Sequence, residues 1–201
     1  MSPARKTQAE RRSATRASVL DAAIQLFGTK GYADTALEEI ASLAGMTIRP
    51  IYHYFGSKLE LFQAVNEIME ERIVDSLQQV DADPMEAWRR YLTLCEDESF
   101  RRIVLLDSPH VLGRERWGGS VVTRTFAARF SGSPGGTEPT LAARMWMGAL
   151  AEAALAIAES DDPTKTNRDA EGLVQLTAHA LALAKAEHRA GEAKDPKGKN
   201  R

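Results

Sequence analysis

Apolar residues recur three or four positions apart along most of the chain, which is the spacing that places side chains on one face of an α-helix. Val19, Ala23 and Phe27 are an early example, and Leu61, Val65 and Met69 a later one. No run of alternating β-branched residues typical of a strand is present. The pattern predicts an all-α protein of about nine helices.

Polar residues and prolines mark where these helices begin. Thr35 and Ser57 are each followed by Glu three positions later, the spacing of a capping box. Thr47 is expected to cap a third helix, although Pro50 can delay its start by a residue or two. Helices are therefore expected from residue 8 or 13 to 29, from 36 to the turn at Gly45, from 47, from 58 to 80, and at 85–95, 98–107, 121–130, 139–160 and 164–188.

Charge is distributed unevenly along the chain. The formal net charge is only −2, yet the first sixteen residues carry Arg5, Lys6, Arg11, Arg12 and Arg16 against Glu10 alone. A basic end on a more acidic body favours an anionic partner that touches that end. The last twelve residues are polar and basic and are expected to form a disordered tail.

The sequence carries no sign of export or of a membrane span. Cys95 is the only cysteine, so no internal disulfide is expected and a reducing compartment is indicated. The N-terminus lacks the apolar segment of a secretory signal. The most apolar stretch, residues 148–158, contains Glu152 and is far shorter than the ~20 residues that a span requires. We expect a cytoplasmic protein without a membrane partner.

The short helix after Gly45 carries the strongest functional signal. It is too short to be stable alone, so Ile51 and Phe55 are expected to pack it against the first two helices. That leaves a surface that suits phosphate and base-edge contacts in a DNA major groove. Lys58 and Thr35 are expected at helix starts, where free backbone N–H groups favour an anion. The candidate contacts with double-stranded DNA are Thr35, Thr47, Arg49, Pro50, Tyr52, His53, Tyr54 and Lys58.

Each of these residues also has a purely structural interpretation. Tyr52 could be partly core, and Arg49 and His53 could be solvated surface residues. Thr35, Thr47 and Ser57 could act only as helix caps, although capping and phosphate contact are compatible.

A specific series of residues between Thr15 and Phe62 adds to the case for DNA binding. The series comprises Ala22-Ala23, Leu26-Phe27, Gly31-Tyr32, Thr35, Ile40-Ala41, Ala44-Gly45-Met46-Thr47, Ile51-Tyr52-His53-Tyr54-Phe55 and Ser57-Lys58. The stretch resembles the DNA-binding head of the TetR family of bacterial transcriptional regulators. Residues 100–117, FRRIVLLDSPHVLGRERW, are similar to the regulatory half of one subgroup of that family.

The resemblance implies a three-helix helix-turn-helix head, joined by a long helix to a helical body that binds a ligand and dimerises. The expected domains are 1–57 with a basic arm, 58–189, and the tail 190–201. Tyr52, His53, Tyr54 and Lys58 fall on positions that the family uses for phosphate and groove contact. Arg49 departs from the family's usual pattern and becomes a candidate to read a guanine.

Two late helices are expected to pair two copies of the chain. Residues 141–157 are apolar on more than one side, which is typical of a helix buried on two sides or shared with a partner. Two such helices from each chain would make a four-helix interface with two-fold symmetry, and the alternative is an internal core. The resemblance implies the homodimer. The candidate interface residues are Leu141, Trp146, Leu150, Ile157, Leu173, Leu176 and Ala180.

The middle helices are expected to enclose a pocket for an apolar small molecule, because large aromatic residues lie beside flexible methionines. Plain core packing is the alternative for each residue. By the resemblance, a ligand there would change the spacing of two DNA-binding heads. The candidate lining residues are Trp88, Tyr91, Leu92, Cys95, Ile103, Leu106, Val111, Trp117, Phe126, Met145, Trp146 and Met147.

The expected function is therefore a ligand-responsive homodimeric repressor that a small apolar effector releases from a near-palindromic operator. A ligand-independent DNA-binding protein or an activator is the alternative. An enzyme is disfavoured, because the histidines lack metal-ligand spacing and no glycine-rich phosphate loop is present. Neither a metal nor another cofactor is expected.

Overall fold

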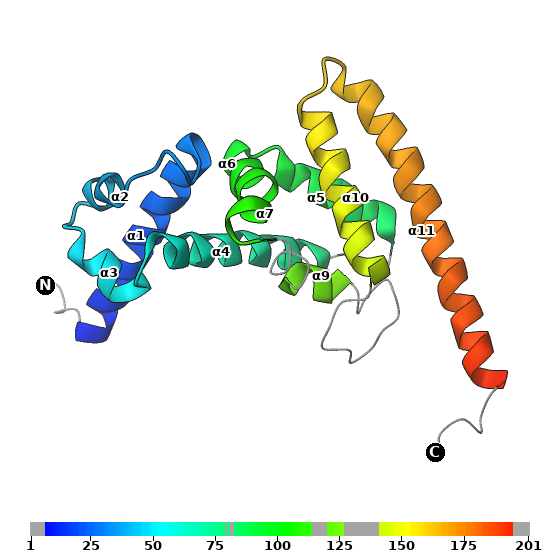
Figure 1. The fold of residues 1–201 in the computed structure, drawn as a ribbon, viewed down its shortest axis with the longest axis horizontal. Coiled ribbons are helices and arrows are strands. Elements are labelled where there is room, and N and C mark those ends of the chain that lie inside the picture. The colour runs from blue at the N-terminus through cyan, green and yellow to red at the C-terminus, as the bar shows by residue number, and fades with distance from the viewer. Residues whose placement is uncertain (1–6, 79, 81–82, 114–119, 127–140, 195–201) are drawn as a thin grey trace, which may run out of the picture. The chain divides into compact units, whose positions relative to one another are not determined.

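The computed structural model describes residues 7–78, 80, 83–113, 120–126 and 141–194, and within these ranges the chain is helical and contains no strand (Figure 1). The predicted all-α class is confirmed. The elements are α1 Gln8–Lys30, α2 Leu37–Leu43, α3 Arg49–Phe55, α4 Lys58–Gln78, α5 Pro84–Cys95, α6 Glu98–Phe100, the π-helix η1 Arg101–Asp107, α7 Ser108–Val111, α9 Val121–Phe126, α10 Leu141–Ala158 and α11 Pro163–Lys194. None of the helices described is long and apolar enough to cross a membrane.

The chain divides into two compact units. The first, here called the head unit, comprises Met1–Glu70 and Glu96–Arg114, and the second, the body unit, comprises Glu71–Cys95 and Glu115–Arg201. The segment from Glu96 to Arg114 thus folds with the N-terminal helices, although body-unit segments flank it in the sequence.

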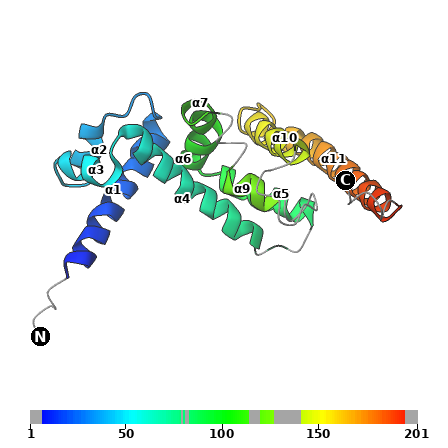
Figure 2. The same cartoon turned by 60° about the horizontal axis from the view of Figure 1, so that its bottom comes forward.

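The core of the head unit forms where α1 to α4 meet (Figure 2). Phe27, Ile40, Ile51 and Phe62 are completely buried there. The rings of Phe27 and Phe62 pack edge to face with their centroids 5.2 Å apart, a favourable arrangement for two aromatic rings. Phe55 is also buried, so the prediction that Ile51 and Phe55 anchor the third helix is confirmed.

The predicted start of the third helix needs a correction. The helix begins at Arg49 with Ile48 as its N-cap residue, and no described side chain caps it. Thr47 is therefore not the cap, and the helix begins later than Thr47, as the sequence allowed, although Arg49 directly before Pro50 is itself helical. The predicted cap of the fourth helix is also confirmed, because Ser57 Oγ accepts a hydrogen bond of 3.1 Å from the backbone N–H of Glu60.

The helix predicted at 98–107 is helical but not α-helical throughout. Asp97 caps its start by accepting hydrogen bonds from the N–H groups of Ser99 and Phe100. After one α-helical turn, Arg101–Asp107 adopts π-helical geometry, and α-helix resumes at Ser108. A π-helix bonds residues five apart instead of four, which periodicity in the sequence did not reveal.

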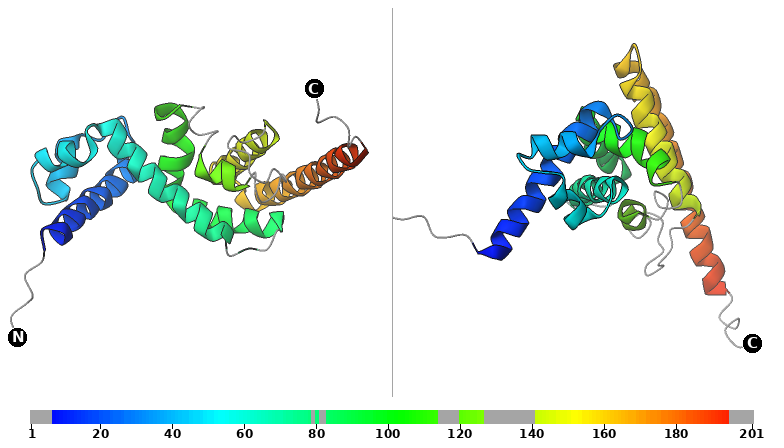
Figure 3. Two further views of the ribbon diagram at one scale, coloured as in Figure 1. Left: turned by 90° about the horizontal axis from the view of Figure 1, so that it is seen from below. Right: turned by 60° about the vertical axis from the view of Figure 1, so that its left-hand side comes forward.

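In the body unit, α10 and α11 lie side by side and run in opposite directions (Figure 3). Trp88, Trp146, Leu150 and Val174 are buried in this unit. The last helix continues through Lys194, so residues 190–194, predicted to belong to a disordered tail, are helical instead. Residues 127–130 and 139–140 of two predicted helices, and 195–201 of the predicted tail, lie outside the described residues.

Candidate nucleic-acid interface

One side of α3 is anchored in the head unit and the other side faces solvent. Arg49, Tyr52 and His53 are exposed, while Pro50 and Tyr54 are half-buried. Tyr52 leaves 52% of its surface accessible, which excludes a core position for this ring. Thr47 is also exposed, just before the helix. The structure thus brings together on one short helix the guanidinium, imidazole and phenol groups that the sequence singled out, and their contacts with DNA stay a prediction.

Two further contacts order the aromatic and basic side chains around α3. The rings of His53 and Tyr54 pack edge to face with centroids 5.0 Å apart. The guanidinium of Arg16 on α1 lies over the ring of Phe55, 5.4 Å from its centroid, within the range of a cation–π interaction. Arg12 is also exposed one turn earlier on α1, so α1 presents two arginines on one face. Sequence analysis placed these arginines in a basic arm able to reach an adjacent groove or the DNA backbone, but it did not single out the face that Arg12 and Arg16 share.

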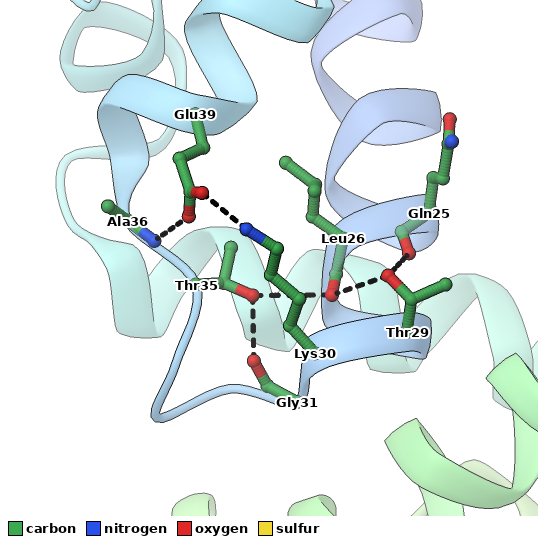
Figure 4. Close-up of polar contacts among 8 residues, drawn as sticks. All are labelled: Gln25, Leu26, Thr29, Lys30, Gly31, Thr35, Ala36 and Glu39. Carbon is green, nitrogen blue, oxygen red and sulfur yellow. Dashed lines mark hydrogen bonds and ion pairs between the residues drawn. The ribbon is translucent and has the colours of Figure 1, made fainter.

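Thr35 does not occupy the position that the sequence predicted. The N-cap residue of α2 is Ala36, whose backbone N–H donates a 3.1 Å hydrogen bond to the carboxylate of Glu39. The side chain of Thr35 is buried, and its hydroxyl donates to the carbonyl oxygens of Gly31 at 2.7 Å and Leu26 at 3.3 Å (Figure 4). This hydroxyl thus binds carbonyl groups at the C-terminal end of α1. The prediction that Thr35 caps α2 is wrong, and we do not propose that its side chain contacts DNA.

An ion pair joins α1 to α2 beside this turn. Lys30 Nζ donates a hydrogen bond to Glu39 Oε1, and both side chains are partly exposed (Figure 4). The hydrogen bond from Lys30, and after it the one from the N–H of Ala36, lowers the pKa of the Glu39 carboxyl below its ordinary value. Because water screens an exposed ion pair, this contact orients α2 locally and adds little to the stability of the protein.

Lys58 lies at the first position of α4, as predicted, but its ammonium group is directed to the turn before α2. Lys58 Nζ donates to the carbonyl oxygen of Ala33 at 3.3 Å and lies 4.4 Å from the centroid of the Tyr32 ring. An ammonium group has three N–H donors, so this arrangement leaves donors for an anion. The Tyr32 ring is itself held by Phe62, with centroids 5.0 Å apart. Sequence reasoning did not identify Tyr32 as a neighbour of this cation.

The predicted pocket residues fall in both compact units. In the body unit Trp88, Tyr91, Cys95, Trp146 and Met147 are buried, and Leu92 is half-buried. In the head unit Ile103 is buried, Val111 is half-buried and Leu106 is exposed. Trp117 and the side chain of Phe126 lie outside the described residues.

The buried aromatic cluster of the body unit centres on Trp88 and Tyr91, whose ring centroids are 6.1 Å apart. Burial raises the pKa of the Tyr91 hydroxyl well above its ordinary value, and the adjacent Cys95 raises it further. The raised pKa keeps the Tyr91 hydroxyl neutral, and a ligand site among these residues stays a prediction.

The predicted interface residues separate into core and surface. Trp146 and Leu150 are buried within the body unit, which is the alternative that the sequence left open. Ile157 is half-buried and Ala180 is exposed. Large apolar side chains nevertheless remain on the surface of both helices: Leu141 is 72% exposed, Met145 66%, and Leu173 and Leu176 65% each. Met145 therefore lies with the interface candidates rather than with the pocket candidates.

Comparisons with known proteins cover most of the chain. Residues 19–65 match the family model of bacterial regulatory proteins of the tetR family, and residues 83–181 match a tetracyclin repressor-like C-terminal domain. The regulator AcrR of Shigella flexneri is 43% identical over 70 residues, which cover 35% of this chain and 32% of that protein. The repressor NicS of Pseudomonas putida is 35% identical over 102 residues, or 46% of each chain. The chain thus spans less than half the length of these curated relatives.

Solved structures resemble the fold over a greater length. A TetR-family transcriptional regulator from Pectobacterium atrosepticum has a TM-score of 0.56 and 28% identity, covering 88% of this chain and 97% of that one. SmeT, the repressor of the Stenotrophomonas maltophilia multidrug efflux pump SmeDEF, has a TM-score of 0.58 over 85% of this chain and 92% of its own. At 24% identity the second likeness concerns the fold alone.

Proposed function

Because the chain belongs to the TetR family of bacterial transcriptional regulators, we propose that it is a homodimeric repressor that binds a near-palindromic operator in the cytoplasm. In this proposal a small apolar molecule releases it from DNA. The observation that carries the proposal is the two-sided α3, with Ile51 buried on one side and Arg49 and Tyr52 exposed on the other.

The side chains on α3 support recognition of duplex DNA. An exposed guanidinium at the start of a recognition helix is suited to a bidentate contact with guanine in the major groove. The exposed hydroxyl of Tyr52 and the imidazole of His53 suit phosphate oxygens. Arg12 and Arg16 on α1 would add non-specific attraction to the backbone. The relative NicS is named as a repressor, which favours repression over activation.

The exposed leucines of α10 and α11 support a homodimer. Large apolar side chains clustered on a surface commonly mark an interface with another protein. A two-fold axis through this surface would present two copies of α3 to the same DNA. Recognition helices about 34–36 Å apart read two half-sites one helical turn apart, so a near-palindromic operator is expected.

The buried aromatic cluster around Trp88 supports a response to a small molecule. An apolar ligand that binds one arrangement of the helices more tightly than another shifts the population between them. Only this difference in affinity is required for release from DNA.

Selection of bound oligonucleotides from a random pool tests the central proposal. The wild-type protein is expected to enrich a site with two related half-sites, and the Arg49→Ala variant is expected to lose preference at one position in each. Lys165→Ala is the matched control, because Lys165 is an exposed cation on α11 in the body unit. Failure of the wild-type protein to enrich any sequence would refute the proposed function.

The effector proposal needs a separate experiment with the recovered duplex. A panel of apolar compounds would be screened for a rise in the melting temperature of the protein and, independently, for release of the duplex. A compound that does both at the same concentration supports the proposal. If no compound in a chemically broad panel changes either quantity, the ligand-independent alternative is favoured.

A further inference from the structure

The head unit contains a segment from the regulatory part of the chain. Glu96–Arg114 folds with the N-terminal helices, yet it lies within the region 83–181 that matches the C-terminal regulatory domain. Within the head unit, α1 packs against both α6 and the π-helix η1. This segment therefore brings α6 and η1, from the region that matches the C-terminal domain, into direct contact with α1.

Two charged side chains of η1 hold the backbone at the end of α1 and just after it. Asp107 Oδ2 accepts a 2.7 Å hydrogen bond from the backbone N–H of Tyr32. Arg102 Nη2 donates a 3.1 Å hydrogen bond to the carbonyl oxygen of Lys30. A Cβ atom on Gly31 would lie only 2.6 Å from Arg102 Nη2, so the glycine between them permits the close approach. We call this pair of contacts the Arg102–Asp107 clamp.

The π-helical geometry explains why both residues reach the same turn. Arg102 and Asp107 are five positions apart, and a π-helix bonds residues with this separation across one turn, so they lie on nearly the same face. In an α-helix of 3.6 residues per turn, positions five apart point about 140° away from each other. A change of η1 from π-helix to α-helix would therefore break one contact or the other.

The turn that follows α1, which the Arg102–Asp107 clamp holds, also contacts Lys58. The Tyr32 ring lies beneath Lys58 Nζ, and the next carbonyl group, that of Ala33, accepts its hydrogen bond. Asp107 is thus connected to Lys58 through a single residue, Tyr32. Asp107 accepts a hydrogen bond from the backbone N–H of Tyr32, and the ammonium group of Lys58 lies over its ring.

We propose that Arg102 and Asp107 are positioning residues that hold Lys58 ready for a DNA phosphate. The inference rests on the proposed DNA-binding function. It assigns a role to two residues of η1 that lie outside the proposed DNA-facing surface.

The salt dependence of DNA binding tests this inference, because each phosphate contact adds about 0.9 to the slope of log affinity against log salt. Affinity for the duplex selected by the wild-type protein would be measured over a range of salt for wild type, Lys58→Ala, Asp107→Ala and the double variant. Lys58→Ala is expected to reduce the slope by about 0.9 per half-site. Asp107→Ala is expected to produce most of the same reduction, and the double variant no further one.

Asp107→Asn is the conservative variant, because its amide oxygen still accepts a hydrogen bond from Tyr32, and it is expected to restore most of the slope. Asp169→Ala, an exposed carboxylate on α11, controls for the change of charge. If Asp107→Ala fails to fold, as judged by circular dichroism, Arg102→Gln tests the other half of the clamp with the same expected loss.

The outcomes separate this inference from the proposed function. If the wild-type protein binds DNA and Lys58→Ala lowers the slope, but the clamp variants keep the wild-type slope, the inference fails alone. An equal loss of affinity from Asp107→Ala with and without Lys58 also overturns it, since that pattern indicates general destabilisation. No binding by the wild-type protein would refute the proposed function itself.

Discussion

Gly28 of α1 lies so close to Ser99 of α6 that a Cβ atom on Gly28 would come within 2.3 Å of Ser99 Oγ and 2.4 Å of Ser99 Cβ. Glycine inside a helix costs about 1 kcal/mol relative to alanine, so its presence here needs a reason. The close approach of α6 supplies that reason. Gly28 thereby joins the Arg102–Asp107 clamp in bringing α6 and η1 against α1.

Gly28→Ala is expected to lower the free energy of unfolding by about 1–3 kcal/mol, because overpacking outweighs the gain in helix propensity. Urea denaturation followed by circular dichroism measures this. The same substitution in a Ser99→Gly background should cost less, although Ser99 Cα at 2.9 Å prevents full relief. Equal costs in both backgrounds would show that the contact with Ser99 is not the cause.

The turn between α2 and α3 depends on the backbone of Gly45 rather than on its small size. Its φ angle is +70°, and no described atom lies within 4 Å of a Cβ placed there. Gly45→Ala should therefore destabilise the protein by about 1–2 kcal/mol through the left-handed conformation alone. Gly45→Asn should cost less, because asparagine tolerates this conformation better. Urea denaturation of both variants provides the comparison, and a larger loss for asparagine would contradict a conformational cause.

Local signals predicted the parts of the fold that depend on neighbouring residues. The periodic positions of Ile51 and Phe55 and the cap at Ser57 needed only a few residues of context, and these predictions are confirmed. Thr35 had an equally good local signature, but its hydroxyl instead serves carbonyl groups at the end of α1. The spacing of Thr35 and Glu38 does not reveal that carbonyl groups of α1 also compete for the Thr35 hydroxyl.

The π-helix and the faces of α10 were beyond sequence reasoning for a different reason. The clamp joins Asp107 to Tyr32, 75 positions earlier in the chain, and no local pattern encodes a contact of that separation. The helix α10 is apolar on several sides, so periodicity could not tell the buried Trp146 from the exposed Leu141. The exposed positions of Arg49, Tyr52 and His53 were easier to predict, because Ile51 and Phe55 anchor one side of α3 and leave the other side outermost.

Arg49→Ala is expected to relax sequence preference more than it weakens binding overall. A bidentate contact between arginine and guanine contributes about 1–3 kcal/mol of discrimination between bases. Selection from random DNA should therefore show the loss of one preferred base pair in each half-site. Arg49→Lys retains the positive charge but loses the planar fork, so it should lower specificity while keeping most of the salt dependence. An unchanged preference in the alanine variant would leave Arg49 as a solvated charge.

The exposed leucines of α11 provide a better test of the dimer than Trp146, whose replacement would damage the core of the body unit. Leu173→Glu and Leu176→Glu each place a charge where 65% of the leucine surface is accessible in the single chain, so each variant should still fold. Burying a leucine contributes about 1.5–3 kcal/mol, and 1.4 kcal/mol is tenfold in affinity. Each substitution should therefore weaken dimerisation at least tenfold, as measured by sedimentation equilibrium.

The matched control is Gln175→Glu, which adds the same charge at an exposed position on another side of α11 and should leave the dimer intact. If the leucine variants dimerise as well as Gln175→Glu does, this surface is not the interface, and the near-palindromic operator loses its structural basis.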